Sequence, residues 1–200
     1  MSFQSDFNCK TINDPIYGLI GLSRIEVQLL DTKAMQRLRR IRQMGFSSYV
    51  FPSGEHSRFA HSLGVLCIMG KMCYHLYHKY CDINPELFTI DDVKKLRIAA
   101  LLHDVGHYPF SHLSEAVYSF VENSRMSASI MEDPIESELL ISSIANQRKN
   151  KSINHEHLGA YVIQNDPEIS KILCDNSIDP VEIGEIITGE IGTRNGSIPN

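Results

Sequence analysis

Apolar residues recur at spacings of three and four over most of the chain, and this pattern predicts a helical protein. One helix is expected to begin behind an N-cap at Asp31 or Thr32 and to run to Met44. A second is expected behind the N-cap Ser57, with apolar residues at helical spacing to about Tyr80. The first part of the chain is therefore expected to be mainly helical.

The next helix is predicted to be the most deeply buried. Thr89 opens an acidic stretch that complements a helix N-terminus, and an apolar helix is expected from Val93 to about Gly106. The run 98–102 leaves no polar face, so this helix should lie inside the molecule.

The rest of the chain continues the helical pattern. Further helices are expected at 114–122, 135–146, from His155 to about Asp166, at 168–174 and at 180–188, with a polar stretch at 123–134. Near the N-terminus, a turn-rich segment at 13–18 separates two short apolar runs, 10–12 and 18–20, that could form strands. We expect one all-α domain over residues 1–200, which a short N-terminal β-hairpin can precede.

Composition narrows the class of protein. Two hundred residues with 42% hydrophobic content suffice for one globular core. No apolar run approaches the roughly 18 residues of a membrane span, and the N-terminus lacks the features of a signal peptide, so a cytoplasmic protein without membrane contact is expected. The five cysteines include no C-x-x-C pair and are expected to be reduced thiols.

Charge adds one local feature. The net charge of -5 argues against general nucleic-acid binding. Five basic residues nevertheless crowd one segment: Lys33, Arg37, Arg39, Arg40 and Arg42. This cluster is either a solvated helix face or a local anion site, and its pattern alone leaves both open.

The stretch 101–112 holds three histidines and an aspartate among apolar residues. His103 and Asp104 are consecutive, so their side chains diverge by about 100° on a helix, yet both can reach an ion at the helix end. His107 returns toward the same side one turn later. Imidazole and carboxylate together suit a divalent first-row metal. The alternative is an ordinary helix end whose imidazoles make local hydrogen bonds.

A metal held by this stretch would need a ligand from elsewhere in the chain. His61 is the best candidate, because it begins a separate helix directly after an Arg-Phe pair and Ala60. Gly-rich phosphate loops, H-E-x-x-H and G-x-S-x-G are absent from the sequence, so serine nucleophile chemistry has no support.

Two motifs carry a resemblance to a known family. Residues 58–65, Arg-Phe-Ala-His-Ser-Leu-Gly-Val, and 99–112, Ala-Ala-Leu-Leu-His-Asp-Val-Gly-His-Tyr-Pro-Phe-Ser-His, resemble the HD-domain metal-dependent phosphohydrolase superfamily. The similarity is closest to its deoxynucleoside-triphosphate triphosphohydrolase (dNTPase) branch. Stretches 12–18, 30–32, 36–45 and 155–156 extend it, in the same order and spacing, over nearly the whole chain.

The resemblance implies a metal set of His61, His103 and Asp104. The ion would be divalent, and Fe, Mn, Zn, Ni, Co and Mg are all compatible with nitrogen and oxygen ligands. In this family a fourth ligand, an Asp, lies in a later stretch resembling D-x-D-R-x-D-Y, and the sequence contains no such stretch. We therefore expect an N-terminal fragment of a longer protein, with weak or no activity on its own.

The implied reaction is metal-dependent hydrolysis of deoxynucleoside triphosphates (dNTPs) to deoxynucleoside and triphosphate. Carried over by position, the residues are Arg58 and His107 for the α-phosphate, His112 as proton donor, His155 and Glu156 as its charge-tuning pair, and Gln43 and Met44 for the sugar.

The resemblance also implies regulation. Positions that bind an activating guanine nucleotide, GTP or dGTP, between subunits of a homo-oligomer match Lys10, Asn13, Asp31, Gln36 and Arg39. Two other functions compete with the dNTPase: another HD phosphohydrolase, such as a nucleotidase or phosphodiesterase, and a non-catalytic module for nucleotide binding or oligomerisation.

Overall fold

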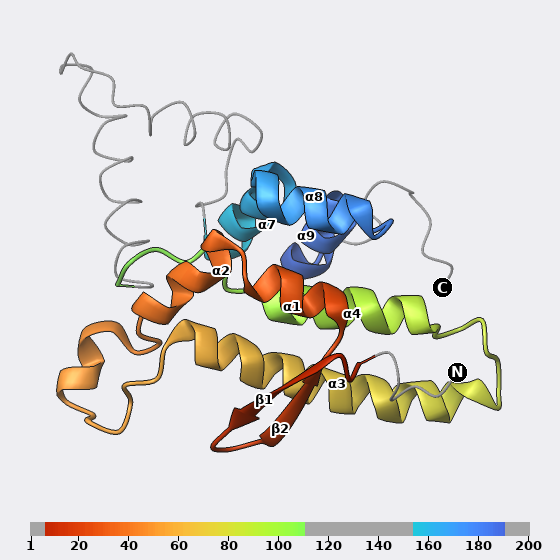
Figure 1. Cartoon of the computed structure of the whole chain (residues 1–200), viewed down its shortest axis with the longest axis horizontal. Helices are drawn as coiled ribbons and strands as arrows, with labels where there is room; N and C mark the ends of the chain where they lie inside the picture. The colour runs from red at the N-terminus through yellow and green to blue at the C-terminus, as the bar shows by residue number, and fades with distance from the viewer. Residues whose placement is uncertain (1–6, 111–153, 191–200) are drawn as a thin grey trace, which may run out of the picture.

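The computed structural model describes residues 7–110 and 154–190, and most of these residues are helical (Figure 1). The helices are α1 (Arg24–Leu30), α2 (Lys33–Arg37), α3 (Arg58–Cys81), α4 (Ile90–Leu102), α7 (His155–Asn165), α8 (Pro167–Asp175) and α9 (Pro180–Thr188), with 3-10 helices η1 (Leu38–Arg40) and η2 (Gly45–Tyr49). The all-α expectation is confirmed. No helix of the described segments is both long and apolar enough to cross a membrane.

The N-terminal hairpin is also confirmed. Strands β1 (Lys10–Asp14) and β2 (Gly18–Leu22) pair antiparallel. The Asp14 carboxylate shapes the turn between them, since it accepts the backbone N–H groups of Ile16 at 2.8 Å and Tyr17 at 2.9 Å. The hairpin lies beside the middle of α3 in Figure 1.

The predicted single helix from Asp31 or Thr32 to Met44 is wrong. Thr32 does cap a helix, but α2 and η1 together end at Arg40, and the next residue, Ile41, is extended. The cause is long-range pairing, because the carbonyl of Ile41 accepts the N–H of Arg58 at 2.8 Å. Backbone bonds to the start of α3 replace the helical bonds that the local pattern predicts.

The N-cap predicted at Ser57 is confirmed, whereas the predicted start of the next helix at Val93 is wrong, because α4 already begins at Ile90 behind the cap Thr89. The Ser57 hydroxyl accepts the N–H of Ala60, and Thr89 forms a capping box with Asp92. The predicted end of α4 at Gly106 is wrong, because the helix stops one turn earlier, at Leu102. The residues that follow form the turn that carries two of the three predicted metal ligands, His103 and Asp104.

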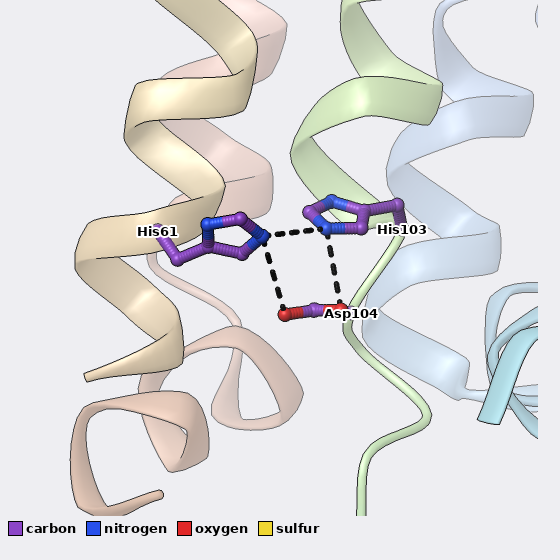
Figure 2. A group of neighbouring side chains, drawn as sticks. All are labelled: His61, His103 and Asp104. Atoms are coloured by element: carbon purple, nitrogen blue, oxygen red, sulfur yellow. Dashed lines mark hydrogen bonds and ion pairs between the residues drawn. The ribbon is translucent and has the colours of Figure 1, made fainter. Parts of the chain in front are cut away.

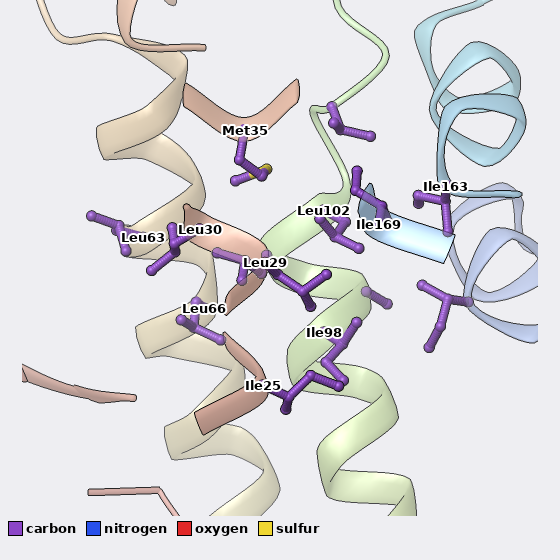
Figure 3. Close-up of a cluster of buried hydrophobic side chains, with 14 of the residues drawn as sticks. Ile25, Leu29, Leu30, Met35, Leu63, Leu66, Ile98, Leu102, Ile163 and Ile169 are labelled. Atoms are coloured by element: carbon purple, nitrogen blue, oxygen red, sulfur yellow. The ribbon is translucent and has the colours of Figure 1, made fainter. Parts of the chain in front are cut away.

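The core is built on α4, which packs between α3 and α9. Side chains from α1 to α4 and from α7 to α9 meet in one cluster, shown in Figure 3. Leu29, Leu66, Leu102 and Ile163 are all 0% exposed. Truncating one of these leucines to Ala is expected to cost about 2–5 kcal/mol. This rigid packing fixes the ends of α3 and α4 relative to each other.

The predicted C-terminal helices are confirmed as α7, α8 and α9 within a residue or two. The helices expected at 114–122 and 135–146, and the polar stretch at 123–134, lie outside the described residues.

Candidate metal centre

Three side chains converge between the first turn of α3 and the end of α4 (Figure 2). The Nε2 atoms of His61 and His103 are 3.3 Å apart. The Asp104 carboxylate reaches both rings, with Oδ1 3.2 Å from His103 Nε2 and Oδ2 3.9 Å from His61 Nε2. The structure thus brings a residue of α3 next to two residues that follow α4, about 40 positions later in the sequence.

The orientation of His103 favours coordination. Its Nδ1 lies 2.8 Å from the carbonyl oxygen of Ala100, one turn back on α4. The tautomer with the proton on Nδ1 satisfies that bond and leaves a lone pair on Nε2. Nε2 is the nitrogen that faces His61 and Asp104.

The separations fit a shared ion. Two ligand atoms about 2.1 Å from one ion lie about 3.0–3.4 Å apart at octahedral or tetrahedral angles. Two of the three separations in this group, 3.2 and 3.3 Å, lie in that range, and the third is 3.9 Å. The group offers nitrogen and oxygen donors and could therefore hold a divalent metal ion.

The charges around the group favour the metal-binding protonation states. Burial would raise the pKa of the Asp104 carboxyl, but His103, Arg58 and His107 outweigh burial and lower it. Burial lowers the pKa of His61, and nearby cationic groups add to this effect against the opposing Asp104. An ionised carboxylate and a neutral imidazole are the ligand forms that a metal needs.

The resemblance implies that Arg58 binds phosphate, and in this structure its side chain contacts Asp104. Its side chain is 1% exposed, and its Nη1 donates to Asp104 Oδ2 at 2.7 Å. A charge-assisted bond of this length fixes the carboxylate. In this structure Arg58 orients Asp104, and its role toward phosphate stays a prediction.

Two further histidines lie close to Asp104. His107 is 1% exposed, and its Nε2 is 3.4 Å from Asp104 Oδ1. The rings of His107 and His155 stack, with centroids 3.9 Å apart and planes 19° apart. These two rings and Asp104 form a second group with ligand-type atoms close together. Glu156 faces Asn154, whose Nδ2 donates to it at 3.0 Å.

A glycine contact brings α7 to this group. A Cβ on Gly106 would lie 2.2 Å from the backbone nitrogen of Gly159 and 2.3 Å from the carbonyl oxygen of His155. Only glycine allows this backbone approach. The contact seats the first turn of α7, and with it His155, against the turn that follows α4.

Arg37 supports the same turn, and the sequence did not single it out. Its Nη1 donates to the carbonyl of His107 and its Nη2 to the carbonyl of Val105, both at 2.8 Å. Burial lowers the pKa of Arg37. In the sequence this residue is one of five clustered cations, and only the fold shows which cation reaches the site.

The predicted sugar-contacting residues lie in the segment before η2. Gln43 donates its backbone N–H to the His56 carbonyl at 3.0 Å. Met44 packs its sulfur over Gly54, where a Cβ would lie 2.2 Å from Sδ. Neither residue belongs to the group of His61, His103 and Asp104. His112, the predicted proton donor, lies outside the described residues.

The predicted regulatory residues fall into two sets. Lys10 and Asn13 lie on β1, whereas Asp31, Gln36 and Arg39 follow one another from the end of α1 to η1. In the second set, Arg39 Nε donates to Gln36 Oε1 at 2.8 Å. The structure places these residues on separate elements and leaves their shared role a prediction.

Sequence comparisons with known proteins found a matching family and several relatives. The HD domain family model matches residues 58–181. The human protein "Deoxynucleoside triphosphate triphosphohydrolase SAMHD1" is 48% identical over 105 residues, which cover 52% of this chain and 16% of the relative. The Dictyostelium discoideum SAMHD1 homolog is 42% identical over 119 residues, 57% of this chain and 22% of the relative. Protein MG461 of Mycoplasma genitalium is 35% identical over 179 residues, 87% of this chain and 34% of the relative. The matches thus cover only 16 to 34% of the length of these relatives.

Proposed function

This chain belongs to the HD-domain family, and on that premise we propose that it takes part in metal-dependent hydrolysis of dNTPs to deoxynucleoside and triphosphate. The observation that carries the proposal is the convergence of His61, His103 and Asp104 with Nε2 and carboxylate atoms 3.2 to 3.9 Å apart. The substrate class is supported by relatives that bear the name deoxynucleoside triphosphate triphosphohydrolase.

The three converging residues would hold the divalent ion. When bound, such an ion polarises a phosphoryl oxygen and lowers the pKa of a water molecule. The chain's own contribution is positioning, because Ala100 fixes the ring of His103 and Arg58 fixes the carboxylate of Asp104.

His107 is proposed to bind the α-phosphate of the substrate, and its Nε2 lies 3.4 Å from Oδ1 of the proposed ligand Asp104. His155, whose ring stacks on that of His107, is proposed to tune the charge of the proton donor His112 together with Glu156. Roles for Arg58 at the phosphate and for Gln43 and Met44 at the sugar belong to the same proposal. Weak or absent activity of the 200-residue chain alone also stays a prediction.

A guanine nucleotide, GTP or dGTP, is proposed to activate a homo-oligomer through Lys10, Asn13, Asp31, Gln36 and Arg39. The support is chemical and local. Asp31 is exposed and can accept guanine N–H groups, and Arg39 lies with its Cζ 3.7 Å above the ring of Phe59. Phe59 directly follows Arg58, so this segment adjoins the residue that orients Asp104.

A product assay tests the catalytic proposal. The protein is incubated with each dNTP and with Mn, Mg, Fe, Zn, Ni or Co in turn, and products are separated by ion exchange. Triphosphate and deoxynucleoside, lost in His61→Ala but not in the surface variant His78→Ala, support it. Inorganic phosphate or a nucleoside monophosphate would instead indicate another HD phosphohydrolase. If the protein shows no metal binding and no turnover, it is a non-catalytic module.

A nucleotide titration tests activation. GTP is added at fixed dNTP, and oligomeric state is followed by sedimentation. Asp31→Ala is expected to remove the rise in turnover and the change in oligomeric state that GTP causes. Asp175→Ala, at another exposed helix end, should retain both responses. Unchanged turnover and sedimentation with GTP would exclude activation.

A further inference from the structure

A hollow of about 380 Å³ lies between the hairpin, α3 and α4. Its wall includes Leu19 and Ile20 of β2, Lys71, Tyr74 and His75 of α3, and Arg97 of α4. None of these residues belongs to the candidate metal centre. The volume lies at the low end of the range of about 300–1,000 Å³ that small-molecule sites occupy.

Arg97 is a fixed cation in this wall. It is 6% exposed, and its Nε and Nη2 donate to the Glu26 carboxylate at 2.7 and 2.9 Å. Nη2 also donates to the carbonyl of Gly21 at 3.0 Å. These bonds use two of the three guanidinium nitrogens, so within the described part of the chain the N–H groups of Nη1 remain to meet a ligand.

Gly70 on α3 lets this third nitrogen reach the hollow. A Cβ at Gly70 would lie 2.2 Å from Arg97 Nη1, so any side chain there would push the guanidinium away. Gly70 and Arg97 both line the hollow. The placement of the cation is therefore built into the packing of α3 against α4.

The other polar groups of the wall are also suited to an anion. Lys71 and His75 are exposed and lie four residues apart on α3, so they share one face. Among the described residues that line the hollow there is no Asp or Glu. Glu26 neutralises the charge of Arg97, so the net positive charge of the wall comes from Lys71, and Arg97 adds the N–H donors of Nη1 that an anion can accept.

The wall also includes apolar and aromatic side chains from β2 and α3. Leu19 and Ile20 come from β2, and the exposed ring of Tyr74 lies edge-on to His75, with centroids 5.7 Å apart. An aromatic ring and aliphatic side chains make a surface for a planar base, as in pockets that stack nucleobases. The hollow therefore combines a site for charge with a site for a ring.

We propose that this hollow binds a nucleoside monophosphate, at a position separate from the metal centre. Arg97 Nη1 and Lys71 Nζ hold the phosphate, and Tyr74 with the exposed side chain of Leu19 covers the base. The site is independent of hydrolysis, because none of its residues is shared with the proposed active site.

Equilibrium binding tests the proposal on the complete 200-residue chain. AMP, GMP and inorganic phosphate are titrated by calorimetry in the presence of EDTA, which keeps the metal centre out of the measurement. We expect saturable binding of one monophosphate with a dissociation constant below about 1 mM. Absence of saturation with both nucleotides would overturn the proposal. Inorganic phosphate binding as tightly as both nucleotides would overturn the assignment to a ring-bearing ligand.

Matched variants locate the site. Lys71→Glu is expected to weaken monophosphate binding by at least about tenfold, since it reverses a charge in the wall. Lys79→Glu is the control, because Lys79 is exposed on the same helix but outside the hollow. Tyr74→Leu should weaken nucleotide but not phosphate binding, and His103→Ala should leave both unchanged. Thermal unfolding confirms that each variant is folded. Equal losses from the two lysine variants would overturn the assignment.

Discussion

Two buried ion pairs involve α4 or the residues just after it, one at Arg97 within the helix and one at Asp104 past its C-terminal end, and they differ in what surrounds the carboxylate. The Glu26 oxygens accept from Arg97 at 2.7 and 2.9 Å and from the backbone N–H of Ser23 at 2.7 Å. Asp104 accepts from Arg58 at 2.7 Å, and imidazole nitrogens lie 3.2 to 3.9 Å from its oxygens. A carboxylate whose oxygens accept several N–H groups, as in Glu26, stabilises the fold. A carboxylate surrounded by imidazole nitrogens, as in Asp104, is arranged so that it and the imidazoles could bind the same metal ion.

The largest expected effect breaks the first pair. Arg97→Met leaves Glu26 charged and buried, at 1% exposure, and is expected to lower the free energy of unfolding by about 3–5 kcal/mol. Urea denaturation measures it. The double variant Arg97→Met with Glu26→Gln should recover part of the loss, because no buried charge remains. A loss below about 1 kcal/mol for the single variant would contradict a structural role for this pair.

The second prediction concerns the carboxylate that faces imidazoles. His103→Ala removes one proposed ligand atom beside Asp104. It should weaken Mn or Zn binding by more than the roughly 10–100-fold that is typical when a residue that orients a metal ligand is replaced. Metal titration by calorimetry measures the change. His78→Ala, on an exposed part of α3, is the matched control. Equal metal affinity in both variants would show that the cluster is only a hydrogen-bonded group.

The third prediction concerns the support of that carboxylate. Arg37→Ala removes two 2.8 Å bonds to the carbonyls of Val105 and His107. Metal affinity is expected to fall about tenfold, since the turn that carries Asp104 is less well held. Arg37→Lys should recover little, because one ammonium cannot reproduce the planar fork. If Arg40→Ala, at the exposed neighbouring position, has the same effect, general charge rather than these bonds is responsible.

The smallest expected effect lies at the start of α4, where the Asp92 carboxylate is partly exposed to solvent and accepts bonds from the nearby Thr89. Bonds from the Thr89 hydroxyl and N–H lower the pKa of Asp92. Because its folded pKa lies below the unfolded value of about 3.9, the stabilisation is present above that pH and is lost as the pH falls through the folded pKa.

Thr89→Ala should therefore cost about 1 kcal/mol at neutral pH and flatten the acid side of the stability curve. Denaturant melts from pH 7 down to pH 2 measure both. Thr11→Ala, on the exposed strand β1, is the control, and an unchanged acid branch in Thr89→Ala would contradict the assignment.

Local chemistry was predictable where it acts within one turn. The cap at Ser57 uses a hydroxyl that bonds three residues ahead, and the sequence alone locates it, whereas the pattern at Thr89 indicates only the start of an acidic stretch and places the start of its helix three residues too late. The ends of helices were less predictable. Ile41 leaves the helical path because its carbonyl bonds to Arg58, and no local pattern records that partner.

The candidate site shows the same division. The proximity of His61 to His103 and Asp104 agrees with the set implied by the resemblance, although metal binding itself remains a prediction. The pairing of Arg58 with Asp104 was not predictable from spacing, because it depends on how α3 crosses the end of α4. Which of the clustered cations supports the site also depends on tertiary packing.

The contact between Gly106 and Gly159 makes part of the site depend on a close backbone approach that leaves no room for a side chain. His155 stacks on His107 only where α7 is docked on the turn after α4. A residue larger than glycine at position 106 would push α7 away and separate these two rings, whereas His61, His103 and Asp104 lie on α3 and the turn after α4 and do not depend on α7. Any change that loosens α7 is then expected to disturb the His107–His155 stack before it disturbs the candidate metal group.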